Sequence, residues 1–149
     1  MESPGRILGL DVGEARTGVA LSDPLGMIAS PHSVVPSADV AQAVAAIARL
    51  VEETGAVGIV VGVPLNQEGQ PGPQAEKVAA FAEQLRRAVP VDVVTQDERY
   101  STAAAQRTLA EAGVRGKKKK RVVDKVAAAH ILQVYLDRAA TERRRATDG

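Results

Sequence analysis

The chain has no cysteine and almost no aromatic side chains: its 149 residues include no Trp, two Tyr and one Phe. Without cysteine it can form no disulfide, no thiolate nucleophile and no cysteine-ligated zinc site. Proteins that hold single-stranded nucleic acid by stacking its bases need aromatic side chains, which this chain largely lacks. No apolar run reaches the length of a membrane span, and the N-terminus lacks the basic-then-apolar pattern of a signal peptide. We therefore expect a cytoplasmic protein that does not bind membranes.

The charged residues are balanced in number but unevenly placed. The formal net charge is +1, and 45% of the residues are hydrophobic, which is ordinary for a globular chain. Six of the seven residues from 115 to 121 are nevertheless basic. We find no repeat and no domain boundary, so we predict a single domain over residues 1–149, with a loose tail at 146–149.

The first third of the chain has the pattern of antiparallel hairpins. Short apolar segments at 7–11, 18–22 and 27–35 follow one another through short turns. Pro31 within the third segment indicates an edge or irregular strand. Ser37 can then cap a helix, whose apolar stripe (positions 40, 44, 47 and 51) ends before a glycine.

The remaining chain alternates strands with helices. The pattern predicts a central strand at 57–63, a helix ended by Pro90, a strand at 91–95, a short helix from Ser101 or Thr102 to Gly113, a basic loop, and a long helix at about 122–140. Hairpins followed by strand-helix-strand units predict an α/β fold, with one mixed sheet and helices on its faces.

Asp11 ends the first apolar segment, where a carboxylate is unfavourable unless it is paired or holds a cation. Strand alternation places Ile7, Gly9 and Asp11 on one face, and Gly9 leaves open space beside the acid. Asp is also common as the cap of a following turn, so this segment alone leaves both interpretations open.

Two other acidic sites are expected near Asp11. Asp97 and Glu98 follow the 91–95 strand, and because neighbouring residues point to opposite faces, only one of them can join Asp11. Asp124 is predicted in the first turn of the last helix, on the apolar face that packs against the sheet. A helix N-terminus also favours a carboxylate, so Asp124 by itself has a simpler explanation.

The cluster, taken together, indicates metal-dependent phosphodiester chemistry. Carboxylates without Cys or His partners prefer Mg²⁺ or Mn²⁺ to Zn²⁺, and a pair of such ions can hydrolyse phosphodiesters. The basic segment leads directly to Asp124 and could hold phosphates, although a lysine run alone is usually a solvated loop. His32 and His130 have no ligand spacing, so we expect them to be structural or solvated.

Four segments resemble the YqgF (RuvX) family, in this order: 8–13 (LGLDVG), 62–66 (GVPLN), 97–99 (DER) and 123–125 (VDK), with Ala127 and Ala128 after the last. That family comprises bacterial RNase H-like nucleases, described as pre-16S rRNA processing nucleases and candidate Holliday-junction resolvases. The resemblance covers nearly the whole chain. It implies an RNase H-like sheet of three antiparallel strands extended by two parallel ones, with helices on both faces.

The resemblance also implies functional residues. By position, Asp11, Glu98 and Asp124 would be the catalytic, metal-binding acids. Better-known related resolvases carry a further acid where this chain has Ala127, so we expect weak metal binding without substrate, and Mn²⁺ more effective than Mg²⁺. The basic residues expected to bind nucleic acid are Arg16, Arg99, Arg115, Lys117, Lys118, Lys119, Lys120, Arg121 and Lys125.

The expected partners are structured RNA such as pre-rRNA, or branched DNA, together with ribosomal particles; the protein would be a monomer or a homodimer. Two alternatives remain open. One is a nucleotide-binding phosphotransferase-like domain of the actin and sugar-kinase type, because the segment 11–19 resembles the first phosphate loop of those proteins. The other is a non-catalytic nucleic-acid-binding ribosome-assembly factor, which the presence of all three acids argues against.

Overall fold

Five strands form one mixed sheet in the order β3-β2-β1-β4-β5. The computed structural model describes residues 5–64, 69, 70, 72–97 and 116–148, with residues 116–122, 147 and 148 described as backbone only. The strands are β1 (Ile7–Val12), β2 (Arg16–Ser22), β3 (Ala29–Pro36), β4 (Gly58–Val63) and β5 (Asp92–Asp97). The three N-terminal strands pair antiparallel, whereas β4 pairs parallel with both β1 and β5. The predicted mixed sheet is confirmed.

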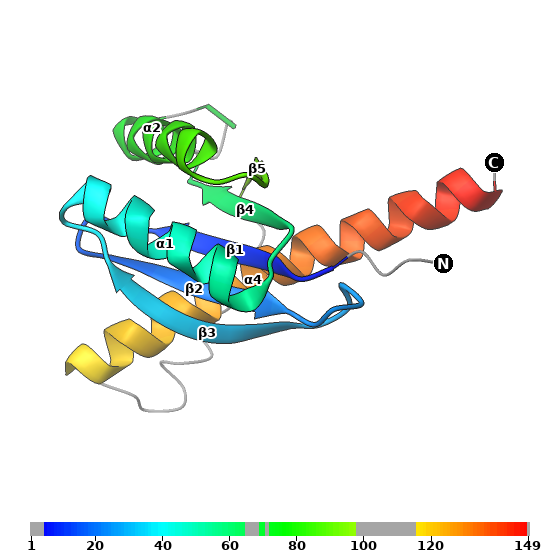
Figure 1. Cartoon of the computed structure of the whole chain (residues 1–149), viewed down its shortest axis with the longest axis horizontal. Helices are drawn as coiled ribbons and strands as arrows, with labels where there is room; N and C mark the ends of the chain where they lie inside the picture. The colour runs from blue at the N-terminus through cyan, green and yellow to red at the C-terminus, as the bar shows by residue number, and fades with distance from the viewer. Residues whose placement is uncertain (1–4, 65–68, 71, 98–115, 149) are drawn as a thin grey trace.

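Helices cover both faces of this sheet (Figure 1). They are α1 (Val40–Thr54), α2 (Pro73–Ala88) and α4 (Gly116–Asp148). The larger core lies under α1 and α2, where Ile47 and Phe81 pack with Leu8 and Leu10 of β1. A smaller core lies under α4 on the opposite face. Within the described helices, no segment combines the length and the apolar character needed to cross a membrane.

The strand at the β3 edge is irregular, as Pro31 predicts. Val19 of β2 pairs with Ser33 and Ala20 pairs with Pro31, so His32 is left out of the register. A proline lacks the backbone N–H that a central strand needs, and an edge position avoids this loss.

The cap of α1 differs from the prediction. Asp39, not Ser37, is the N-cap, and its carboxylate accepts a hydrogen bond from the backbone N–H of Gln42. Ser37 instead donates its hydroxyl to the carbonyl oxygen of Gly13 at 2.6 Å, and so ties the end of β3 to the β1–β2 turn. Both residues are good cap formers, and the sequence does not choose between positions two residues apart. Gly55 ends the helix with a φ of 72°, as expected.

The last helix is much longer than predicted. The expected basic loop was wrong over Lys117–Arg121, because the backbone there already belongs to α4, and residues 146–148 continue the helix rather than forming a loose tail. Lysine and arginine are good helix formers, so a basic run is compatible with a helix even though it gives no apolar periodicity. The predicted short helix ending at Gly113 lies outside the described residues.

The position of α4 depends on two glycines of the sheet. A Cβ added at Gly9 would lie 2.7 Å from the Cβ of Leu132, and one added at Gly18 would lie 1.9 Å from the carbonyl oxygen of Asp124. Neither distance is possible for real atoms, so the helix backbone crosses β1 and β2 where no side chain intervenes. Small side chains thus bring Asp124 onto the sheet.

The close approach at Gly18 predicts a specific sensitivity. Gly18→Ala should destabilise the fold by about 2 kcal/mol or more, because the added methyl group meets helix backbone that cannot rotate away. The urea midpoint measures this. Gly58→Ala is the matched control, since its nearest contact is the flexible tip of Ile7 at 3.3 Å. Equal losses in the two variants would contradict the proposed contact.

Candidate active site

Asp11 and Asp124 are brought together by the residue between them. Asp11 stands directly opposite Gly18 in the β1–β2 pairing. Gly18 in turn touches the backbone of Asp124. The predicted face of Ile7, Gly9 and Asp11 is the one that α4 covers, because Gly9 meets Leu132 and Ala128 there. Two carboxylates from distant parts of the chain therefore share one side of the sheet.

Burial makes the Asp11 carboxylate electrostatically unfavourable. Desolvation by burial and, to a smaller extent, the neighbouring Asp124 charge together raise the pKa of Asp11 from 3.8 to about 6. Within the described part of the chain, no hydrogen-bond donor or cation offsets these effects at Asp11. Either protonation of Asp11 or a cation bound beside it would remove the cost of this buried charge.

Asp124 has a protein cation beside it. The Nε of Arg16 donates to Oδ2 of Asp124 at 3.0 Å, with the two side chains 34% and 23% exposed. Arg16 begins β2 and points to the α4 face, as Gly18 does. Asp124 is the ninth residue of α4, so the expected helix-dipole explanation for it was wrong: the dipole acts within the first turn.

Asp97 lies on the other face of the sheet. Its neighbour Gln96 is buried toward α4 and donates its side-chain amide to the carbonyl oxygen of Ile131 at 2.8 Å. Strand alternation then directs Asp97, at the last position of β5, toward the α1 and α2 side. Asp97 is thus separated from Asp11 by the sheet.

The remaining predicted residues are described only in part. Glu98, Arg99 and Arg115 lie outside the described residues, and for Lys117, Lys118, Lys119, Lys120 and Arg121 the structure gives the helical backbone alone. Lys125 is half-buried beside Asp124. Among the described side chains, no three acids or histidines gather closely enough to hold a metal ion. His32 and His130 are exposed, as expected.

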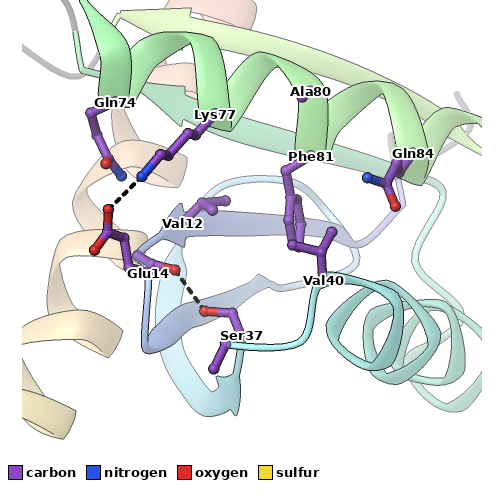
Figure 2. A pocket seen from close by; sticks show the side chains of 11 residues that line it. Val12, Glu14, Ser37, Val40, Gln74, Lys77, Ala80, Phe81 and Gln84 are labelled. Atoms are coloured by element: carbon purple, nitrogen blue, oxygen red, sulfur yellow. Dashed lines mark hydrogen bonds and ion pairs between the residues drawn. The ribbon is translucent and has the colours of Figure 1, made fainter.

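A pocket that no sequence pattern predicts lies on the opposite face (Figure 2). It has a volume of about 410 Å³ and lies between α1 and α2, with Val12, Val40 and Phe81 among its walls. At its rim, Lys77 donates to the Glu14 carboxylate at 2.7 Å, and both side chains are well exposed. Glu14 is the sole carboxylate among the lining residues, so this pocket is separate from the acidic pair.

The Arg16–Asp124 ion pair also had no sequence signal, because its partners are 108 residues apart. The fold alone brings them together. The sequence shows only that the basic residue Arg16 follows Asp11 by five positions, and it predicts nucleic-acid binding for Arg16.

Comparison with known proteins agrees with the predicted resemblance. The model of the RuvX family, described as Holliday junction resolvase, matches residues 5–138. A protein of Moorella thermoacetica named "Putative pre-16S rRNA nuclease" is 47% identical over 133 residues, covering 89% of this chain and 95% of its own length. One of the same name from Syntrophomonas wolfei is 42% identical over 132 residues, covering 89% and 94%.

Solved structures share the fold at low identity. RuvC of T. thermophilus, in complex with a Holliday junction substrate, superposes with a TM-score of 0.59 at 15% identity, covering 92% of this chain and 97% of that one. The fowlpox virus Holliday junction resolvase gives 0.51 at 12% identity, covering 89% and 98%. The fold expected from the four sequence segments is confirmed. With a family model matching nearly its whole length and relatives above 40% identity, the chain belongs to the RuvX family.

Proposed function

We propose that the protein is a metal-dependent endonuclease that hydrolyses phosphodiester bonds in nucleic acid, in pre-16S rRNA 5′-end processing, Holliday-junction resolution or both. The observation that carries the proposal is the pairing of Asp11 with Asp124 across Gly18, with Asp11 desolvated and without a partner among the described residues. A partly buried carboxylate pair, with the charged form of one member disfavoured, is unfavourable for folding, so its presence favours a functional role.

The names of related proteins support the substrate class. The relatives are named for pre-16S rRNA, and the family description and the structural neighbours are named for Holliday junctions. Both substrates present a phosphodiester backbone, and contacts to phosphates do not distinguish RNA from DNA. The shared feature, a structured nucleic acid, is therefore what we carry over to this chain.

Glu98 is the third acid of the proposed site. Gln96 faces α4 and Asp97 faces away from it, so Asp97 does not join Asp11. This agrees with the family motif, in which Glu98 rather than Asp97 holds the matching position.

The donors of this site fit a hard divalent cation. Asp11 and Asp124 supply carboxylate oxygens, and no thiolate exists in the chain, so Mg²⁺ or Mn²⁺ is favoured over Zn²⁺. When bound, such ions activate the attacking water and stabilise the leaving oxygen. The chain itself would hold the ions with Asp11, Glu98 and Asp124, and would bind the flanking phosphates with the basic residues of α4.

The helical backbone of α4 divides its basic residues into two sets. Positions 117, 120 and 121 fall within about 60° of position 124 around a helix of 3.6 residues per turn, whereas positions 118 and 119 fall more than about 100° away. We propose that the first set, on the side of Asp124, contacts substrate phosphates.

The decisive experiment is a cleavage assay with labelled pre-rRNA and branched DNA. Mn²⁺ should support cleavage best, Mg²⁺ less well and Zn²⁺ little, because Mn²⁺ tolerates an imperfect carboxylate shell. Glu98→Gln should lower the rate by at least about 100-fold, while Asp97→Asn, the matched control, should have a much smaller effect. Cleavage that continues in excess EDTA would disprove the metal mechanism.

The raised pKa of Asp11 predicts the pH dependence of stability. Since the folded protein holds its proton up to about pH 6 and the unfolded chain only to about pH 4, stability is lost as the pH rises through this interval. In EDTA, Asp11→Asn should therefore gain up to about 3 kcal/mol over the wild type at pH 7, and little at pH 4. The same substitution should abolish cleavage, because it removes a proposed metal ligand.

Urea unfolding at the two pH values measures the effect, and Asp39→Asn is the control. Asp39 is an exposed helix cap that Asn can replace without loss. A gain for Asp11→Asn that is larger at pH 4 than at pH 7 would contradict the assigned burial.

The two sets of lysines predict different effects on binding. Lys117→Ala with Lys120→Ala should weaken binding to all nucleic-acid sequences and lower the slope of log affinity against log salt by about one unit per lysine. Lys118→Ala with Lys119→Ala removes the same charge from the other side of the helix and should change the slope less. Filter binding at several salt concentrations measures both, and equal slopes would refute the assignment.

A further inference from the structure

Arg16 engages one of the two carboxylate oxygens of Asp124, Oδ2. Its Nε lies 3.0 Å from Oδ2, within hydrogen-bond distance, and the contact is partly buried. A guanidinium group and a divalent cation both bind carboxylate oxygens, and two positive groups on one carboxylate repel each other, so each weakens the binding of the other. The described structure thus shows one of the two proposed metal ligands already engaged by a protein cation.

We propose that Arg16 is an internal counter-ion that holds Asp124 in the metal-free protein and competes with a divalent cation for its carboxylate. Arg16 would then be a positioning residue that sets the metal affinity of the site. The inference rests on the proposed function in one respect, namely that Asp124 is a metal ligand.

The backbone geometry decides which partner moves. The backbone of Asp124 is held in place, because its own carbonyl group is pressed against Gly18 of β2. The backbone of Arg16 is also fixed, since it pairs with Pro36 in the sheet. The long side chain of Arg16 is one-third exposed, however, so it has a route into solvent that leaves both backbones in place. Exchange between the guanidinium and a metal ion therefore needs rotation of one side chain only.

The contact leaves most of the guanidinium available. A single nitrogen, Nε, makes the ion pair, whereas a guanidinium carries five N–H donors. The group is thus suited to bind a substrate phosphate once it leaves Asp124. Nucleic acid would then favour release of Asp124, so substrate and metal would each strengthen the binding of the other. The proposal therefore predicts weak metal binding without substrate, independently of Ala127.

Isothermal titration of the full chain with Mn²⁺, in the absence of nucleic acid, tests the proposal. Arg16→Gln should bind Mn²⁺ on the order of tenfold more tightly than the wild type, because the competing cation is gone. Arg86→Gln is the matched control: it also removes a guanidinium paired with a carboxylate, that of Glu83, but on α2 across the sheet. Its affinity should equal that of the wild type.

A second measurement uses the unaltered protein and does not depend on the variant folding. In ¹⁵N–¹H spectra, the Nε–H of Arg16 should be protected without metal and should lose its protection in step with saturation by Mg²⁺. A protected Nε–H at saturating Mg²⁺, or an equal or weaker Mn²⁺ affinity in Arg16→Gln, overturns the inference.

Asp124→Asn separates this outcome from failure of the proposed function. If the wild type binds Mn²⁺ and Asp124→Asn does not, the metal site stands, and the Arg16 results decide the inference alone. If Asp124→Asn binds Mn²⁺ as tightly as the wild type, Asp124 is not a metal ligand, and both the inference and the proposed metal site are refuted.

Discussion

The contact between Gly18 and the backbone of Asp124 is the constraint on which the site depends. A helix of 33 residues spans about 50 Å, while a strand of six residues spans about 20 Å, so α4 must cross the sheet and extend past it. Figure 1 shows it projecting on both sides. Where it crosses, Gly9 and Gly18 have no side chains, and α4 presents buried alanines. Asp124 reaches Asp11 because the crossing is this close.

The same closeness makes the site unfavourable for folding. Two carboxylates lie together on a covered face, where desolvation and the neighbouring Asp124 charge disfavour the charged form of Asp11. The fold offsets one of them through Arg16 and leaves the other, Asp11, without a donor among the described residues. Such unequal compensation suits a site that exchanges a protein cation for a bound one, since a fully neutralised pair would have little affinity left for a metal ion.

The sequence predicts features that leave a local pattern better than features that depend on residues far apart in the chain. Apolar periodicity identified the strands and the buried face of α1, because burial of Ile47 or Leu10 leaves a local pattern. The basic segment of α4 was wrong as a loop because charged residues mark no face, although they form helices well. The Arg16–Asp124 pair links positions 108 residues apart and leaves no local pattern at all.

The larger hydrophobic core and the proposed active site lie on opposite faces of the sheet. The α1 and α2 side holds the larger cluster of buried side chains, including Leu8, Ile59 and Phe81, so it provides most of the hydrophobic burial. The α4 side has a smaller cluster, with Ile131 and Leu132, and glycines where the helix crosses closely. If the acids lay over the larger core instead, each substitution at the site would also disturb the packing of that core. Here Asp11 and Asp124 meet at Gly18, so they can carry charge while the opposite face maintains the fold.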